Sequence, residues 1–175
     1  MPPPVVLASG EMRPWPPTAD VVVVPWVRNE RGATAGLKTT SYAENVRALA
    51  FAHERGASEA IFPNTQDLLC EGTGSNVFLV VDGGLVTPPL ASGCLAGVTR
   101  DLVLLLCERT GIACAERDVP VASLGAADEA FLTSSTREVH PIAHVDGHAL
   151  PVAPGPITRA LQDAWRDLLA DDLDP

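Results

Sequence analysis

Apolar positions along the chain switch between two patterns, continuous runs and helical spacing. Residues 21–26 form a continuous apolar run, which is typical of a strand buried on both faces. From Ser41 onward the pattern becomes helical, with Val46 and Leu49 on one face, and Gly56 ends the predicted helix. The same patterns predict further strands at 59–63, 68–71, 76–82, 85–87, 113–119, 129–133 and 138–145, and further helices at 98–110 and 156–170.

This order of elements predicts the fold class. Hairpins dominate, as at the Gly83-Gly84 turn, and strands and helices do not alternate regularly. We therefore expect an α+β fold with a mixed, barrel-like sheet and about three helices. Residues 1–19 are crowded with proline, which favours an extended connector. Residues 20–175 have the length and pattern of one domain with its own core.

Composition narrows the classes of function. The 175 residues are 46% hydrophobic and 19% charged, a globular balance, and the net charge of −10 leaves no basic patch for nucleic acid. No apolar run reaches membrane-spanning length, and no basic region precedes an apolar one at the start. The four cysteines form no Cys-x-x-Cys pair, so we predict buried thiols in a reducing cytosol. We expect a cytoplasmic protein with no nucleic-acid or membrane partner.

A single lysine, Lys38, stands among eleven arginines. Arginine is a permanent cation, whereas a lysine amine can lose its proton and act as a nucleophile or base. The chemistry reserved for this amine is the Schiff base, formed with a carbonyl substrate or with pyridoxal phosphate. Taken alone, the single lysine is better explained by a GC-rich genome that encodes Arg in place of Lys. The interpretation therefore depends on the surrounding motifs.

Two other segments indicate an anion site. The Gly-Val-Thr-Arg segment at 97–100 stands where a helix is predicted to begin, and the N–H groups and dipole of a helix N-terminus attract anions. The Thr-Ser-Ser-Thr segment at 133–136 follows an apolar strand, and hydroxyl and N–H groups at a strand end can cradle phosphate. An ordinary helix cap and an ordinary polar loop are the alternatives. Together with a unique lysine, the segments describe a site for a phosphate-bearing carbonyl cofactor.

Four segments together resemble one enzyme family. They are Leu-Lys-Thr-Thr-Ser-Tyr at 37–42, Glu-Gly-Thr-Gly-Ser-Asn-Val-Phe at 71–78, Gly-Val-Thr-Arg at 97–100 and Thr-Ser-Ser-Thr-Arg-Glu-Val at 133–139. In this order and spacing they are similar to the class IV pyridoxal-phosphate enzymes of fold type IV. That family includes branched-chain aminotransferases, D-amino-acid aminotransferases and 4-amino-4-deoxychorismate lyases. The resemblance runs from about Val21 to the last predicted helix and implies the large, cofactor-binding domain of that fold.

The resemblance implies a role for each matching residue. Lys38 would hold pyridoxal phosphate as an internal aldimine and shuttle protons, and Glu71 would keep the pyridine nitrogen protonated. Tyr42 would reach the phenolic oxygen of the cofactor. Thr136 and Arg137 would offer backbone N–H groups to a substrate carboxylate. The implied phosphate contacts are those of Val98, Thr99 and Ser135, with Ser134 and Thr136 beside them.

Two activities on a small-molecule substrate are implied by the resemblance. One is amino transfer from an amino acid to a 2-oxo acid, and the other is elimination of pyruvate from aminodeoxychorismate. The segments at 71–78 and 133–139 look slightly more like those of bacterial lyases and lyase-like aminotransferases. The family resemblance also implies a homodimer with the active site near its interface.

These enzymes normally begin with a smaller α/β domain, and nothing in the chain corresponds to it. We expect residues 1–19 to be a linker or a remnant of such a domain, and residues 20–175 to be the PLP-binding large domain. The alternative is a truncated, non-catalytic remnant that serves as a structural or dimerising module. Retention of Lys38 and Glu71 argues against that alternative, because a hydrophobic core needs neither.

Three histidines recur at four-residue intervals, at positions 140, 144 and 148. On a helix they would share one face and could ligate a metal, but Pro141 and Gly147 disfavour a helix there. In an extended strand the three side chains share a face and lie too far apart for one ion. We therefore expect no metal.

Overall fold

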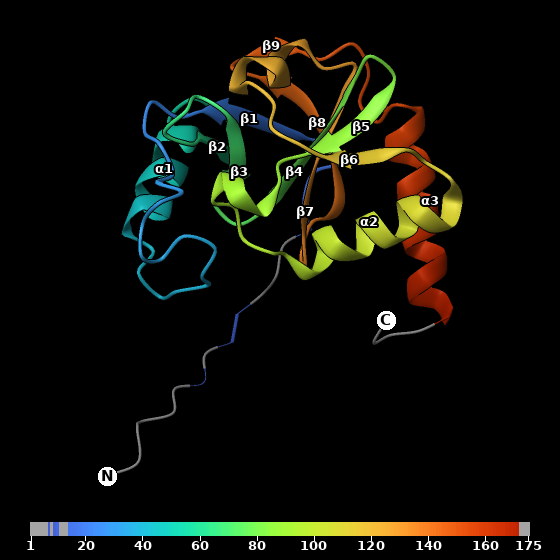
Figure 1. The fold of residues 1–175 in the computed structure, drawn as a ribbon, viewed down its shortest axis with the longest axis horizontal. Helices are drawn as coiled ribbons and strands as arrows, with labels where there is room; N and C mark the ends of the chain where they lie inside the picture. The colour runs from blue at the N-terminus through green and yellow to red at the C-terminus, as the bar shows by residue number, and fades with distance from the viewer. Residues whose placement is uncertain (1–6, 8, 11–13, 172–175) are drawn as a thin grey trace.

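The computed structural model describes residues 7, 9, 10 and 14–171 (Figure 1). Within these residues the elements follow the hydrophobic pattern to within a few positions. The strands are β1 (Ala19–Val23), β2 (Glu59–Pro63), β3 (Leu69–Gly72), β4 (Asn76–Val81), β5 (Gly84–Thr87), β6 (Cys114–Glu116), β7 (Glu129–Ser134), β8 (Glu138–Val145) and β9 (His148–Ala149). The helices are α1 (Ala43–His53), α2 (Val98–Thr110) and α3 (Pro156–Asp171), with 3₁₀ turns η1 (Leu90–Ser92) and η2 (Val121–Ala126).

The strands form one mixed sheet that curls into a barrel-like shape, which confirms the predicted fold class. Its order is β3-β2-β1-β8-β7-β4-β5-β6, and β9 pairs with β8. The pairs β1–β2, β1–β8 and β5–β6 are parallel, and the other pairs are antiparallel. The two ends of this order approach each other, because the Leu69 N–H donates to the Val119 carbonyl at 2.9 Å.

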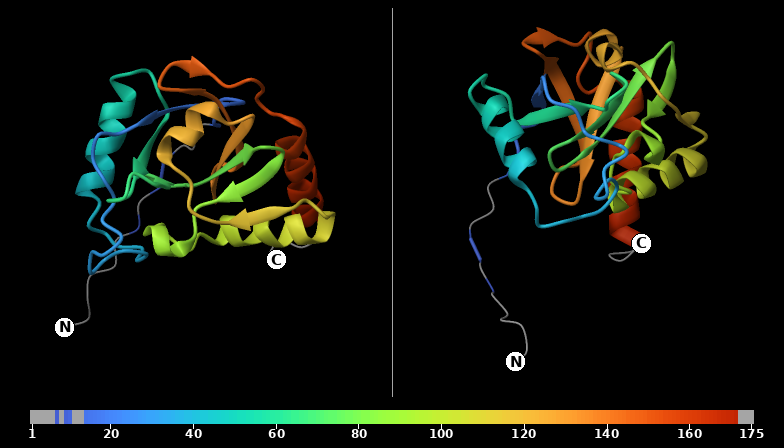
Figure 2. Two further views of the ribbon diagram at one scale, coloured as in Figure 1. Left: turned by 45° about the horizontal axis from the view of Figure 1, so that its top comes forward. Right: turned by 60° about the vertical axis from the view of Figure 1, so that its left-hand side comes forward.

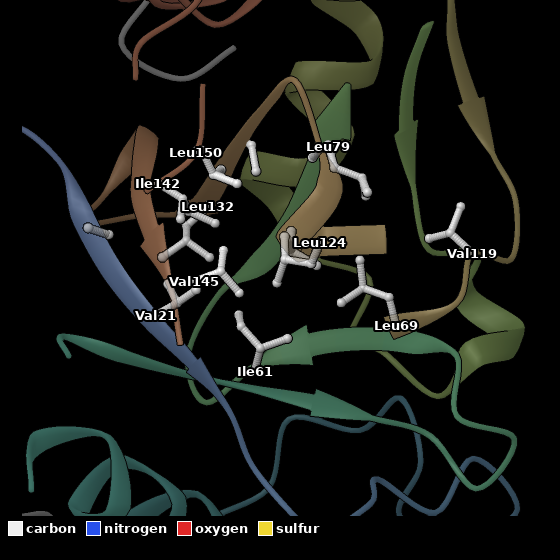
Figure 3. Packing of buried hydrophobic residues seen from close by; sticks show 14 of the residues in the cluster. Val21, Ile61, Leu69, Leu79, Val119, Leu124, Leu132, Ile142, Val145 and Leu150 are labelled. Carbon is white, nitrogen blue, oxygen red and sulfur yellow. The ribbon is translucent and has the colours of Figure 1, made fainter. Parts of the chain in front are cut away.

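The inside of the curled sheet is filled with aliphatic side chains (Figure 3). Val21, Ile61, Leu79 and Leu132 come from four different strands, and Leu124 of η2 packs among them. All five side chains are fully buried. Burial of this interior provides the main stabilisation of the fold, because removal of apolar surface from water is favourable in proportion to its area.

The helices cover the outside of the sheet in two groups (Figure 2). Helix α1 packs through Ala48 and Ala52 over β1 and β2. Helices α2 and α3 lie together on the other side, where Phe78 and Phe131 stack with ring centroids 4.9 Å apart. Because both faces of these central strands are buried, β4 has a continuous apolar run at residues 77–81 and β7 has one at residues 130–132.

Two predictions from the sequence concern the proline-rich connector at the start of the chain and the histidines at four-residue intervals. Residues 2–4 of the predicted connector lie outside the described residues, and the boundary at residues 19 and 20 stays a prediction. His140 and His144 lie on β8, so their spacing is that of a strand. None of the described helices combines the length and the apolar character needed to cross a membrane.

Candidate functional site

A cavity of about 840 Å³ opens where four segments meet. We name them the lysine loop (residues 29–42), the carboxylate loop (71–76), the cup segment (95–99) and the end of β7 (133–136). Each segment lies far from the others in sequence, and the sheet topology brings them together. Of the residues singled out from the sequence, eight line this cavity and Arg137 does not; the eight are Lys38, Tyr42, Glu71, Val98, Thr99, Ser134, Ser135 and Thr136.

The lysine loop connects β1 to α1 and is built from successive turns. The N–H groups of Gly32, Ala35 and Leu37 each donate to a carbonyl three residues earlier. Lys38 follows these turns and is exposed to solvent along the cavity wall. Tyr42 precedes the first turn of α1 and is 42% exposed. The amine and the phenol therefore reach the cavity from the same side, and neither is packed into the core.

Glu71 is the buried carboxylate of the cavity, and both of its oxygens are engaged. Oε2 accepts a hydrogen bond from the Leu95 N–H at 2.8 Å. Oε1 lies 3.2 Å from Nε of Arg28, a close ion pair that lacks hydrogen-bond alignment. Burial raises the pKa of Glu71, and the Leu95 N–H and the Arg28 guanidinium act in the opposite direction. A carboxylate has about four lone-pair sites, so Glu71 can still accept a proton-bearing ring nitrogen.

The carboxylate loop is held from behind by a second buried acid, Glu59 of β2. Its carboxylate accepts hydrogen bonds from the Thr73 N–H at 3.1 Å, from the Thr73 hydroxyl and from the Ser75 hydroxyl at 3.0 Å. The Arg137 guanidinium lies 3.8 Å from the same carboxylate, and both side chains are 4% exposed. These bonds fix the turn between β3 and β4 and thereby the direction in which Glu71 points.

The cup segment ends in the N-terminus of α2. Gly97 is the N-cap residue and provides no side-chain cap, so the first N–H groups of the helix have no capping oxygen. These groups belong to Val98, Thr99 and Arg100, and no intrahelical carbonyl can reach them. Thr99 is buried at this end, whereas the Val98 side chain is 72% exposed. Free N–H groups and a helix dipole of this kind favour an anion, which is the role that the sequence predicts for this segment.

The end of β7 provides the hydroxyl groups opposite the cup segment. Ser134, Ser135 and Thr136 lie on the turn from β7 to β8, and the Ser134 hydroxyl accepts a hydrogen bond from the Arg137 N–H at 3.1 Å. The Arg137 N–H, considered above for a substrate carboxylate, is therefore engaged within the turn. Thr133 is buried, and its hydroxyl has no hydrogen-bond partner among the described residues.

Sequence reasoning missed Arg28, Asn45 and Glu59. Arg28 follows β1 in the sequence and lines the cavity. One feature of the sequence could have indicated it, because it is a charged residue shortly after the apolar run at 21–26. Its guanidinium stacks 4.3 Å from the Phe62 ring centre and donates to Asn45 Oδ1 at 2.9 Å. Asn45 in turn donates to the Thr73 carbonyl at 2.7 Å, which joins α1 to the carboxylate loop. No local pattern in the sequence pairs these residues.

Comparison with known proteins identifies the family. The model of the family described as amino-transferase class IV matches residues 4–145, so the chain belongs to this family. The crystal structure of the branched-chain amino acid aminotransferase from Thermobaculum terrenum in its PLP form superposes with a TM-score of 0.83. It is 38% identical, and the match covers 89% of this chain and 52% of that one.

Curated relatives carry two names within the family. A branched-chain-amino-acid aminotransferase of Pseudomonas aeruginosa is 36% identical over 131 residues, which is 74% of this chain and 42% of that protein. A D-alanine aminotransferase of Bacillus licheniformis is 36% identical over 137 residues, which is 78% of this chain and 48% of that protein. The chain thus spans about half the length of the relatives it matches.

Proposed function

We propose that this chain binds pyridoxal phosphate in the cavity through Lys38 and provides the cofactor-binding part of an aminotransferase that moves an amino group from an amino acid to a 2-oxo acid. The observation that carries the proposal is the convergence of three groups on one cavity. They are the lysine Lys38, the buried carboxylate Glu71 and the uncapped N-terminus of α2. The two curated relatives described above are both aminotransferases, which supports amino transfer, and pyruvate elimination is the alternative that the assay below separates.

The donor groups fit the chemistry of the cofactor. A phosphate suits the free N–H groups of Val98 and Thr99 and the hydroxyls of Ser135 and its neighbours Ser134 and Thr136. A protonated pyridine nitrogen suits a buried carboxylate. The cavity volume of about 840 Å³ is within the range of small-molecule sites and leaves space for a substrate beside the cofactor.

Pyridoxal phosphate, when bound, provides an electron sink that stabilises a carbanion next to the amino group of the substrate. Lys38 is the residue that would hold the cofactor at its aldehyde carbon, and once a substrate amine has taken that place, the Lys38 amine would move a proton at the substrate α-carbon. Glu71 would hold a proton on the ring nitrogen and maintain the electron demand of the ring. Tyr42 would donate its hydroxyl proton toward the phenolic oxygen of the cofactor.

The test exploits the single lysine of the sequence. Purified protein is mixed with pyridoxal phosphate, its visible spectrum is recorded, and borohydride reduction is followed by mass spectrometry of the digested chain. We expect a new absorbance band and a reduced adduct on Lys38. Because the chain has one lysine, the N-terminal amine is the other primary amine that could carry an adduct.

The matched control is Lys38→Arg, which keeps the positive charge and removes the nucleophile. It should show neither the band nor the adduct. A wild-type protein that stays colourless and unmodified would contradict the proposal and favour a non-catalytic module.

Keto-acid formation from an amino donor, measured beside pyruvate and 4-aminobenzoate from aminodeoxychorismate, separates the transferase from the lyase. The homodimer and the cytoplasmic location stay predictions.

A further inference from the structure

Asn76 is a buried polar residue of the cavity wall with two contacts to the cup segment. It begins β4 and is 5% exposed. Its Nδ2 donates to the Leu95 carbonyl at 2.8 Å. Its Oδ1 lies so close to Gly97 that a Cβ built on this glycine would overlap it. One side chain therefore contacts both Leu95 and Gly97, with Ala96 between them.

The segment held in this way takes part in both ends of the site. At one end the Leu95 N–H donates to Glu71 Oε2 at 2.8 Å. At the other end Gly97 is the N-cap of α2, and its carbonyl accepts the Asp101 N–H at 3.0 Å. Only Ala96 separates Leu95 from Gly97. A shift of this segment would therefore move the Leu95 N–H, which binds Glu71, and the N-terminus of α2 together.

We propose that Asn76 is a positioning residue that fixes the Leu95–Gly97 segment, so that the carboxylate site of Glu71 and the anion site at the N-terminus of α2 keep one spacing. The inference rests on the proposed function, because a cofactor that binds Glu71 through its ring nitrogen and the N-terminus of α2 through its phosphate would require one constant spacing between the two sites. Asparagine suits this place because it combines an N–H donor for the Leu95 carbonyl with a compact oxygen beside Gly97. Aspartate at this position would place a carboxylate beside the Leu95 carbonyl, and no hydrogen bond can form because both groups are acceptors.

The ionisation of Glu71 reports on this segment without any cofactor. The charged and titratable groups that face Glu71 are Arg28 beyond β1, Glu59 of β2, Cys70 of β3 and Cys94 before the cup segment. Substitution of Asn76 leaves all of these groups in the chain. The Leu95 N–H lowers the pKa of Glu71, so its loss raises that pKa.

The experiment compares Asn76→Ala and Asn76→Asp with a control of similar burial, Thr158→Val. Thr158 is buried at the start of α3, and its hydroxyl donates to Glu129 Oε2 at 2.8 Å. Three quantities are measured on the full chain: the free energy of unfolding in urea, the pKa of Glu71 by ¹³C NMR of the cofactor-free protein, and the dissociation constants of pyridoxal phosphate and of pyridoxal. Glu71→Gln assigns the NMR signal.

We expect both Asn76 variants to raise the Glu71 pKa by about half a unit or more and to weaken pyridoxal phosphate binding about tenfold, the equivalent of one lost hydrogen bond. Pyridoxal, which lacks the phosphate, should lose less. Thr158→Val should lower stability and leave the Glu71 pKa and both dissociation constants unchanged.

The inference would be overturned if the Asn76 variants lower stability as Thr158→Val does and leave the Glu71 pKa unchanged. Asn76 would then be a packing residue. If Asn76→Ala does not fold, Asn76→Ser, which is a smaller change and adds no charge near Glu71, decides by the same measurements. If the wild type binds no cofactor, the proposed function fails, and the Glu71 titration alone then decides whether Asn76 positions the segment.

Discussion

The lysine loop and the carboxylate loop border the same cavity and are built in opposite ways. The lysine loop is exposed and held mainly by turns within itself, and Lys38 extends from it without burial. The carboxylate loop is buried and braced by Glu59, and Asn45 secures it from α1. The difference teaches what each group has to do. The proposed roles account for the difference: a carboxylate that holds one direction needs rigid supports, whereas an amine that acts as nucleophile and base needs freedom to move.

The largest effect expected from this comparison is that of Lys38→Ala. It should abolish the borohydride-trapped adduct in the cavity, because the sequence has no other lysine and the N-terminal amine is the one primary amine left. The exposed side chain contributes little to the fold, so the free energy of unfolding without cofactor should change by less than about 0.5 kcal/mol. Borohydride trapping and urea unfolding measure the two quantities. A large loss of stability would mean that the lysine loop is a structural element.

The opposite result is expected for Glu59→Ala in the carboxylate loop. This change leaves the buried Arg137 without its charge partner and removes the acceptor of Thr73 and Ser75. Breaking a buried pair in this way costs about 3–5 kcal/mol. Urea unfolding measures the cost, and Glu44→Ala on the exposed face of α1 is the control. Equal stability of the two variants would show that Glu59 does not brace the loop.

A smaller effect is expected for Arg28→Gln, which removes the cation beside Glu71. The pKa of Glu71, already raised by burial, should rise further by about one unit, and pyridoxal phosphate should bind about tenfold more weakly. Arg28→Lys keeps a charge but not the planar stack on Phe62, so it should restore part of the loss. ¹³C NMR titration reads the pKa. If the Glu71 pKa is the same in Arg28→Gln as in the wild type, Arg28 does not act on the Glu71 carboxylate.

The smallest effect is a contrast in pH dependence between two carboxylates. The pKa of Glu30, at the start of the lysine loop, is lowered to about 2, chiefly by the Thr65 hydroxyl, which donates to it at 2.6 Å. Its contribution to stability is therefore present above the ordinary glutamate pKa and is lost as the pH falls toward 2. The pKa of Glu71 is raised, so the folded state holds this proton more tightly, and stability falls as the pH rises through that pKa.

Urea unfolding across the acid range tests both signs. Glu30→Gln should flatten the loss of stability at low pH, and Glu71→Gln should flatten the decline toward neutral pH. Identical pH profiles in the two variants would contradict the contrast between the two loops.

Much of the fold followed from local patterns. The strand β8 has the predicted bounds, Glu138–Val145, and α2 begins at Val98 as predicted. These agreements have a physical basis, because burial on both faces of a strand or on one face of a helix imposes a period that is visible in the chain itself. The order of the elements predicted a barrel-like sheet, but the contacts that close it, such as that of Leu69 with Val119, join distant residues and left no local pattern.

The sequence by itself determined which residue types were available to the site, namely one lysine, a glutamate in a Gly-rich turn and hydroxyls at a strand end, together with the order of the elements. Local periodicity and residue chemistry carry that information. Tertiary structure alone decided that Glu71 lies between the Arg28 guanidinium and the Leu95 N–H, and that Asn76 contacts both Leu95 and Gly97. These contacts join residues that lie 43 positions apart for Arg28 and Glu71, 24 apart for Glu71 and Leu95, and 19 apart for Asn76 and Leu95. They form only when the curled sheet brings the ends of β1, β3 and β4 together.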